Sequence, residues 1–249
     1  MDIKYWLGYL SEWLGVIAVG MIAGASPIFT KIRQVEFRFP QREATFTLSV
    51  FAIIYLLAFQ YYSNPILGFL VKLAEGFSGG DLSSRMVLAG IGLILFVLAM
   101  FLRGQPFKSI GWGRANLKAG ATLGFLLVLL TVFLRGKFLI LLRGISPEQG
   151  NLLLVWLILS LAEETIFRGY IQLRLTTFLG STWGWLATAG LFLLWQLPGR
   201  LWILPFSEIL PFMILSTGQA LLLGWIMRKS GHVLAPALFR AVAGWLLLI

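Results

Sequence analysis

The sequence predicts an all-α, polytopic transmembrane bundle of about eight helices. The 249 residues are 59% hydrophobic and 12% charged, with a mean hydropathy of +0.88, which is typical of multi-pass membrane proteins rather than soluble domains. Apolar segments recur along the chain, without the alternation of barrel strands and without an internal repeat. No polar stretch is long enough for a second fold, so we expect one membrane domain over residues 1–249.

The first half of the chain is expected to hold four spans. The first is interpreted as an anchor, because no small-residue cleavage site of a signal peptide is convincing. A break at Asn64-Pro65 is expected in the second. The four spans are Tyr5–Phe29, Thr45–Leu70, Met86–Leu102 and Ala119–Leu134. The expected connections are a charged loop Lys31–Glu43, a Gly/Ser-rich loop Glu75–Ser84, a basic loop Arg103–Lys118, and a short interfacial segment Phe138–Leu142.

The second half is expected to hold four more spans. Turn signals at Ser146-Pro147 and Gly150-Asn151 precede the first of them. The span that begins at Trp183 is expected to end at Pro198-Gly199. In order, the segments are Asn151–Leu175, Trp183–Leu197, a short stretch Leu201–Phe206 flanked by Pro205 and Pro211, Pro211–Met227, and Val233–Ile249.

Charge and residue usage exclude several functional classes. The net charge of +10 is attributed to cationic loops facing anionic lipid, since no DNA- or RNA-binding motif accompanies it. The chain has no cysteine, and His232 is its single histidine. Disulfides, thiolate metal sites, a cysteine nucleophile and two-histidine metal sites within the chain are therefore excluded, and we expect no metal and no cofactor.

The distribution of Lys and Arg favours one orientation. Twelve cations fall on one side of the predicted spans and seven on the other, so the first side is predicted to be cytoplasmic and both termini to lie opposite. The first set is Lys31, Arg33, Arg38, Arg42, Arg103, Lys108, Arg114, Lys118, Arg168, Arg174, Arg228 and Lys229; the second is Lys4, Lys72, Arg85, Arg135, Lys137, Arg143 and Arg200.

Two adjacent carboxylates and an arginine interrupt the fifth span. Charged side chains at bilayer depth are unfavourable by about 2.5–3.5 kcal/mol each, so their presence there suggests a use. The apolar run Leu152–Leu161 covers roughly 15 Å, about half the hydrocarbon core, so the helix is expected to continue through Glu163 and Arg168. Glu164 and Arg168 have the spacing and order of a helical ion pair, whereas Glu163 points about a quarter-turn away and needs another partner. The plainer alternative is an ion pair at the membrane interface.

The motif Glu163-Glu164-x-x-x-Arg168-Gly169, in a polytopic chain of this size, resembles the first motif of the CPBP intramembrane proteases, the CAAX-processing and bacteriocin-processing (Abi) group. The resemblance covers roughly Gly111 to the C-terminus, so residues 111–249 are expected to form the CPBP-like core. It implies an eight-helix bundle with a polar cavity. In this family a glutamate and a histidine activate water against a peptide bond, and a second histidine with an asparagine steadies the oxyanion.

The second and third family motifs are altered in this chain. The segment Phe192-Leu193-Leu194-Trp195-Gln196 has glutamine where the family has histidine, and Arg240 and Gly244 replace the histidine and asparagine of the third motif. Glutamine does not exchange a proton near neutral pH, and arginine stays protonated. The family-site equivalents are therefore Glu163, Glu164, Arg168, Gln196 and Arg240.

A charge count predicts that the charged residues of this site neutralise one another. Two glutamates and two arginines balance, so Arg240 is expected to pair with Glu163 across the bundle, as intramembrane charges normally do. His232 lies eight residues before Arg240, about 12 Å along a helix, and is expected to be a surface histidine at the interface rather than a replacement base. Glu12 is expected near the interface, and Gln60, Asn64, Gln172 and Gln219 are expected to form helix–helix hydrogen bonds.

Three functions remain open from the sequence. The favoured one is a non-catalytic CPBP-like protein that binds or helps assemble a membrane protein partner. The alternative is an active glutamate-dependent intramembrane endopeptidase, with Glu163 as base and Gln196 or Arg240 as oxyanion donors. A small transporter component has the weakest support, because repeats and paired broken helices are lacking. The expected partners are a membrane protein, as partner or substrate, and the lipid bilayer, but no nucleic acid.

Overall fold

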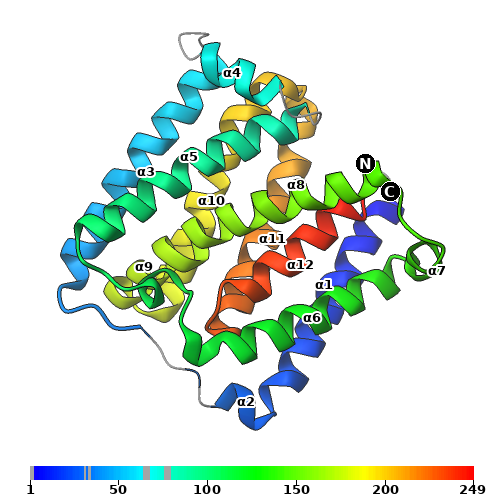
Figure 1. Ribbon diagram of the computed structural model, residues 1–249, viewed down its shortest axis with the longest axis horizontal. Helices are drawn as coiled ribbons and strands as arrows, with labels where there is room; N and C mark the ends of the chain where they lie inside the picture. Colours follow the sequence, from blue (N-terminus) through cyan, green and yellow to red (C-terminus); the bar gives the residue numbers. More distant parts are fainter. Residues whose placement is uncertain (1–2, 31, 33–34, 64–67, 76–79) are drawn as a thin grey trace.

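The chain folds into a bundle of long helices (Figure 1). The computed structural model describes residues 3–30, 32, 35–63, 68–75 and 80–249. The long helices are α1 (Ile3–Gly24), α3 (Pro40–Ser63), α5 (Asp81–Leu102), α6 (Leu117–Leu134), α8 (Pro147–Glu164) continued by η4 (Thr165–Gln172) and α9 (Leu173–Leu179), α10 (Ser181–Ile203), α11 (Phe206–Ser230) and α12 (Leu234–Trp245). Shorter turns are α2 (Pro27–Thr30), α4 (Gly68–Glu75), η2 (Phe107–Ile110), η3 (Arg114–Asn116) and α7 (Phe138–Leu142). The predicted bundle of about eight helices is confirmed.

The first half follows the predicted spans with shifted boundaries. α3 begins at Pro40, so Glu43 belongs to the first turn of a helix and the predicted loop to Glu43 is too long. Proline at a helix start is favourable, because its missing N–H would have no intrahelical partner there. α5 likewise begins at Asp81, inside the predicted Gly/Ser loop. The predicted break at Asn64-Pro65 and the cations Lys31 and Arg33 lie outside the described residues.

Prolines do not end the helices of the second half as predicted. α10 continues through Pro198 to Ile203, and α11 begins at Phe206 and contains Pro211. The last turns of α10 are held by neighbouring helices: Arg200 pairs with Asp81 of α5 at 3.3 Å, and Trp202 packs edge-on against Phe59 of α3. Packing of this kind is the usual reason that proline is tolerated inside membrane helices.

Small residues allow α12 to lie close to α6 and α8, the two helices with which it packs most extensively (Figure 1). A Cβ added at Gly124 of α6 would lie 3.0 Å from Leu238 and 3.2 Å from the Ala235 backbone of α12. Gly244 of α12 packs against the indole of Trp156 in α8. Close approach of helix backbones at small residues is the main source of helix association in membranes. This packing brings Arg240 of α12 next to α8.

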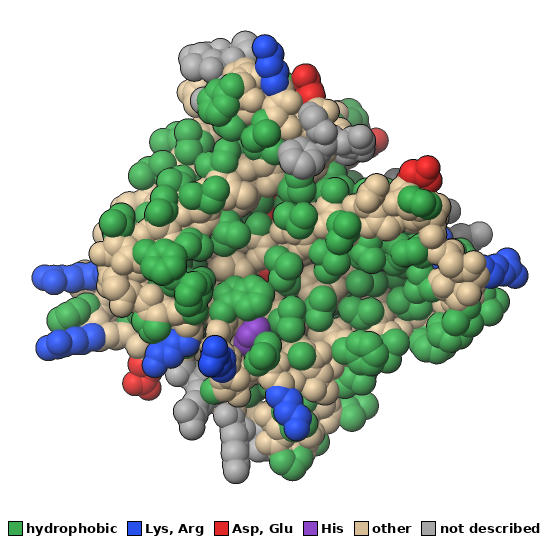
Figure 2. All heavy atoms as spheres, viewed as in Figure 1, with side chains coloured by type: hydrophobic (Ala, Val, Ile, Leu, Met, Phe, Trp, Pro, Cys, Tyr) green, Lys and Arg blue, Asp and Glu red, His purple; other side chains and the backbone are tan. Residues whose placement is uncertain are grey.

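The surface is that of a multi-pass integral membrane protein. Six helical segments in the described part of the chain are long and apolar enough to cross a bilayer: α1, α3, α5, α6, α8–α9 and α11. Large apolar side chains are exposed on the outside of the bundle, and Figure 2 shows them covering most of one face while Lys and Arg gather along its edges. Which edge is cytoplasmic stays a prediction. Arg168 and Arg174, counted above among the cations on the predicted cytoplasmic side, are buried within the bundle.

Candidate functional site

The acidic motif lies at the centre of the longest span. The segment from Pro147 to Leu179 has 33 residues, and Glu163 lies at its middle. Ser146 and Gln149 form a capping box that fixes the start of this helix. Residues Thr165–Gln172 adopt a π-helix, a rare conformation that is frequent at functional sites. Both glutamates are fully buried within the bundle, and their depth in the membrane stays a prediction.

Arg240 bridges the two glutamates from the facing helix α12. Its Nη2 donates a hydrogen bond to Oε2 of Glu163, and its Nη1 donates to Oε1 of Glu164 at 2.8 Å. Arg240 is itself only 3% exposed. The predicted pair between Arg240 and Glu163 is therefore present, and the same guanidinium also engages Glu164.

Arg168 completes the charged centre from the π-helix. Its Nε lies 3.1 Å from Oε2 of Glu164, which is the helical ion pair that the spacing predicts. Its Nη2 donates to the backbone oxygen of Ala220 in α11 at 3.1 Å. The ring of Phe192, the phenylalanine of the second motif, lies 4.4 Å from the guanidinium carbon of Arg168 and 4.9 Å from that of Arg240. This ring thus provides a cation–π contact to both arginines.

Two further side chains contact Glu163, and the sequence reasoning missed both. Trp195 of α10 donates from Nε1 to Oε1 of Glu163 at 2.9 Å, and Arg85 of α5 places Nη2 3.5 Å from Oε2. Trp195 precedes the motif glutamine, so its position next to the site could have been found from the motif. Arg85 was counted only among the cations flanking the predicted spans, just before Met86. Its contact depends on α5 beginning at Asp81, which the hydropathy pattern did not show.

Gln196 lies beside the charged centre and is not hydrogen-bonded to it. Its side chain is 8% exposed, and its Nε2 has no hydrogen-bond partner within the described protein. It faces a cavity of about 100 Å³ that Arg85 and Arg240 also line. The structure therefore brings together four of the five family-site equivalents through direct contacts, Glu163, Glu164, Arg168 and Arg240, and places the fifth at the wall of a cavity next to them.

His232 is not a surface histidine as predicted, and it is not at the charged centre. It is 1% exposed in the connection between α11 and α12. Its ring packs edge-on against Trp112, and its Nδ1 accepts the N–H of Leu234 at 3.1 Å. Burial lowers the pKa of His232. The reason for the wrong prediction is the close approach of Gly120 in α6, which packs directly against the histidine.

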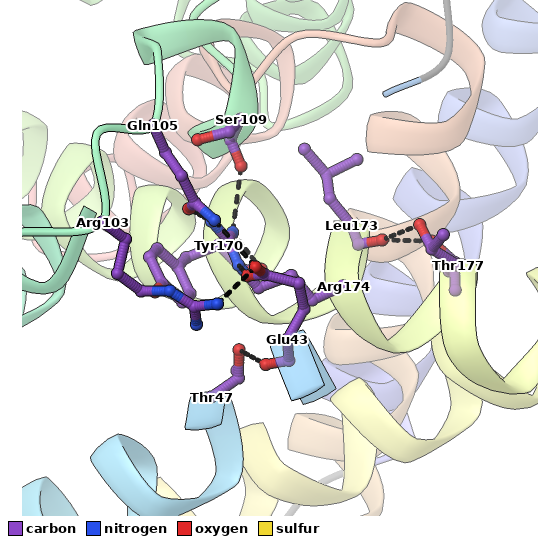
Figure 3. A network of polar contacts seen from close by, with 10 residues as sticks. Glu43, Thr47, Arg103, Gln105, Ser109, Tyr170, Leu173, Arg174 and Thr177 are labelled. Atoms are coloured by element: carbon purple, nitrogen blue, oxygen red, sulfur yellow. Dashed lines mark hydrogen bonds and ion pairs between the residues drawn. The ribbon is translucent and has the colours of Figure 1, made fainter. Parts of the chain in front are cut away.

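A second polar network anchors the far end of the motif helix (Figure 3). Arg174 of α9 is fully buried; its Nε lies 3.1 Å from Oε2 of Glu43 in α3, and its Nη1 donates to the backbone oxygen of Ser109 at 3.0 Å. Glu43 also accepts from Arg103 at 2.6 Å and from Gln105 at 2.9 Å. The network joins α3, the end of α5 and the loop before α6 to the helix that carries the acidic motif. It therefore fixes the rotation of that helix.

Two of the other polar residues singled out in the sequence, Glu12 and Gln172, make contacts between helices. Glu12 is 3% exposed and pairs with Arg135 at 2.7 Å, and its expected position near the membrane interface stays a prediction. Gln172 donates to the backbone oxygen of Gly224 in α11 at 3.0 Å, so its predicted helix–helix hydrogen bond is confirmed. Gln60 is exposed, and Asn64 lies outside the described residues.

The arrangement at the centre suits charge neutralisation better than proton transfer. A general base needs a free lone pair near a water molecule and a pKa near the working pH. Here both carboxylates accept hydrogen bonds from one guanidinium, and neither Arg240 nor the nearby Gln196 exchanges protons near neutral pH.

The comparisons with known proteins cover the second half of the chain. Residues 148–246 match the family model described as Type II CAAX prenyl endopeptidase Rce1-like. No curated protein and no solved structure matches the chain. The matched residues include the acidic motif, Phe192–Gln196 and Arg240, but not residues 111–147 of the predicted core. The resemblance stated from the motifs is thus confirmed, and residues 148–246 form a segment similar to the Rce1-like type II CAAX prenyl endopeptidases of the CPBP family.

Proposed function

We propose that this chain is a CPBP-like membrane protein that does not cleave peptides and instead binds or helps to assemble a membrane protein partner. One observation carries the proposal: Arg240, at the position of a motif histidine, bridges Glu163 and Glu164 inside the bundle. The two carboxylates that would activate water are held by a permanently charged donor.

The geometry supports a structural use of the retained charges. Glu163 accepts from Trp195 and from Arg240, and Glu164 lies between Arg240 and Arg168, so four helical segments meet at these two side chains. Buried charges that are paired and hydrogen-bonded keep helices in one register, and removing a single partner is strongly destabilising. A centre of this kind maintains the family fold while its chemistry is absent. What remains available for function is the membrane-facing surface.

An active endopeptidase is the second candidate, and one observation favours it. The cavity beside Arg240 is lined by N–H donors of Arg85, Arg240 and Gln196, which would suit an oxyanion. This second candidate requires that the hydrogen bond from Arg240 to Glu163 break during the reaction, so that Glu163 can bind a water molecule instead. The two candidates differ in whether Glu163 is needed for turnover.

The deciding experiment compares wild type with Glu163→Gln after affinity purification from native membranes. Partner stoichiometry and new protein termini are read by mass spectrometry, and Glu208→Gln, an exposed glutamate in the first turn of α11, serves as the matched control. A stoichiometric partner that is intact in all three samples supports the proposal. New termini that are present in the wild type and absent from a Glu163→Gln sample with the same amount of folded protein establish the protease. Absence of both a partner and new termini refutes the partner-binding role.

A further inference from the structure

A large open cavity lies at the end of the bundle where α1, α9 and α11 finish (Figure 1). Its volume of about 870 Å³ is within the range of about 300–1,000 Å³ that is typical of ligand pockets. On the motif helix its lining begins at Gln172, which is roughly 13 Å along the helix from Glu163. Within the described residues, the lining includes none of the charged side chains around Glu163. What the cavity binds is therefore independent of the charged centre.

Two cations at the wall of this cavity have no carboxylate partner. Neither Arg228 nor Lys229 forms a salt bridge within the part of the chain that the structure describes. Each lies beside an indole instead: the guanidinium carbon of Arg228 is 5.3 Å from the ring centre of Trp185, and Nζ of Lys229 is 5.6 Å from that of Trp225. Such cation–π contacts hold both charges beside the cavity.

The charges of the wall do not balance. Glu36 is the single carboxylate among the described lining residues, and it is exposed. Two cations against one carboxylate leave a net charge of +1, so the complementary ligand carries one negative charge. A tetrahedral anion such as a phosphodiester has this charge, and its oxygens accept charge-assisted hydrogen bonds from Arg and Lys.

The other lining groups suit a ligand that is polar at one end and apolar at the other. Thr176 and Thr177 donate their hydroxyl hydrogens to the backbone oxygen of Leu173 at 3.1 and 2.7 Å, so each offers a lone pair to a ligand hydroxyl. Phe29 and Trp225 add apolar surface to the lining. The cavity thus combines cations, acceptors for a hydroxyl and an apolar wall.

The position of the cavity fits the level of lipid headgroups. Tryptophan side chains favour this level, and Trp185 and Trp225 are half-buried beside the two cations. Arg228 and Lys229 also belong to the set of cations predicted to face the cytoplasm, where the leaflet is rich in anionic lipid. Basic pockets between membrane helices on that side are suited to anionic headgroups.

We propose that this cavity binds a phosphate group carried by the headgroup of an anionic phospholipid. The phosphate oxygens accept hydrogen bonds from Arg228 and Lys229, and a headgroup hydroxyl donates to the threonine oxygens. The acyl chains leave along the apolar wall towards the bilayer. This inference goes beyond the proposed function, because it involves no residue of the charged centre and holds whether or not the chain cleaves peptides.

The test measures binding of phosphatidylglycerol and of phosphatidylcholine to the purified full chain in detergent, by native mass spectrometry of lipid titrations. We expect phosphatidylglycerol to bind about tenfold more tightly, because phosphatidylcholine carries no net charge. Each Lys or Arg beside an anionic lipid contributes about fivefold in affinity, so Arg228→Gln/Lys229→Gln should weaken phosphatidylglycerol about 25-fold. Arg228→Lys/Lys229→Arg keeps both charges and should keep the binding. Unfolding temperatures in lipid-free detergent verify that the variants are folded.

The matched control for the charge is Arg114→Gln/Lys118→Gln. Arg114 and Lys118 are exposed, belong to the same predicted cytoplasmic set and do not line the cavity. Their loss changes the net charge of the protein by the same amount, so we expect the affinity for phosphatidylglycerol to change by less than about twofold. Equal losses in the two double variants would show attraction to a basic surface and would overturn the site.

A second pair of variants tests the cavity rather than the charge. Gly24 of α1 lines the cavity, and no atom lies within 4 Å of a Cβ added there, so Gly24→Leu occupies part of the space without removing a charge. Gly8→Leu, at an equally open position of the same helix outside the cavity, is the control. We expect Gly24→Leu to weaken phosphatidylglycerol about fivefold and Gly8→Leu to leave it unchanged. Equal affinities of the two variants would overturn the site.

A soluble phosphate ester separates the two sources of the same chemistry. If glycerol 3-phosphate binds as tightly as phosphatidylglycerol, the anion site stands and its assignment to a lipid is wrong. Binding of phosphatidylglycerol alone supports the lipid, and equal binding of phosphatidylglycerol and phosphatidylcholine overturns the inference. These titrations measure neither cleavage nor a protein partner, so their failure leaves the proposed function standing, and failure of the proposed function leaves the lipid result readable.

Discussion

Arg240 donates a hydrogen bond to Glu164 at 2.8 Å, across 76 positions of sequence. The same guanidinium donates to Glu163, so one side chain of α12 fixes both carboxylates of α8. The pair lies in the middle of a membrane-spanning helix, where unpaired charges are especially unfavourable. Arg240 thus ties the third motif segment to the first.

Loss of Arg240 should destabilise the fold strongly. Arg240→Leu leaves two buried carboxylates with only Arg168 and Arg85 nearby, and removal of one partner of a buried pair typically destabilises by about 3–5 kcal/mol. Thermal unfolding in detergent is the measurement. The double variant Arg240→Leu/Glu163→Gln should recover part of the loss, because it removes one of the uncompensated charges. If Arg240→Leu left the unfolding temperature unchanged while Glu163→Gln lowered it, the pairing of the two residues would be refuted.

Glu43 should contribute as much to the stability of the fold as a residue of the acidic motif, although it lies in α3. Glu43→Gln removes the carboxylate from Arg174, which is fully buried, and from Arg103. We expect a loss of about 3–5 kcal/mol in stability. Glu208→Gln, on the exposed first turn of α11, should change stability by less than about 0.5 kcal/mol. Similar unfolding temperatures for both variants would show that the network in Figure 3 contributes little.

Gly169 should not tolerate a side chain. An added Cβ would collide with the backbone oxygen of Ile110 and approach Val233 at 3.0 Å, so Gly169→Ala should separate the π-helix from η2 and destabilise by about 1–3 kcal/mol. Gly190→Ala in α10 is the matched control: no atom lies within 4 Å of its Cβ, and alanine should raise stability by up to about 1 kcal/mol. The expression yield and unfolding temperature of the two variants provide the comparison. If Gly169→Ala unfolds no earlier than Gly190→Ala, the close approach is not needed.

Acidification should weaken the fold through His232. Burial lowers its pKa, so the unfolded chain, with an ordinary pKa of 6.5, binds a proton that the folded protein does not. The unfolded state therefore binds more protons below about pH 6.5, and stability is fully present above that pH and falls as the pH decreases towards the folded-state pKa. His232→Asn keeps an acceptor for the N–H of Leu234 and does not titrate. Between pH 7.5 and 5.5 the unfolding temperature of the wild type should decrease by more than that of this variant. Equal decreases in the two proteins would contradict the prediction.

The candidate site could be predicted in part from the sequence. The half-length apolar run placed Glu163 and Glu164 deep in the membrane, helical spacing gave the pair between Glu164 and Arg168, and charge balance gave the pair between Glu163 and Arg240. The two pairs are confirmed because each depends on a local period or on the free energy of a buried charge, whereas the depth of the glutamates in the membrane stays a prediction. The contact of Arg85 was missed because it depends on α5 beginning at Asp81, whereas that of Trp195 could have been inferred from its place next to the motif glutamine.

The sequence by itself determined the class of fold, the order of the spans and the presence of a charged centre, because bilayer thickness and burial of charge act on any apolar chain in the same way. Only the tertiary structure decided where helices end and what their polar faces meet. α10 runs through Pro198 because α3 and α5 hold its last turns, and His232 is buried because Gly120 allows α6 to approach. The pair between Glu43 and Arg174 spans 131 positions. Such contacts depend on helix rotation and close approach, which the packing of the whole bundle fixes and local sequence does not.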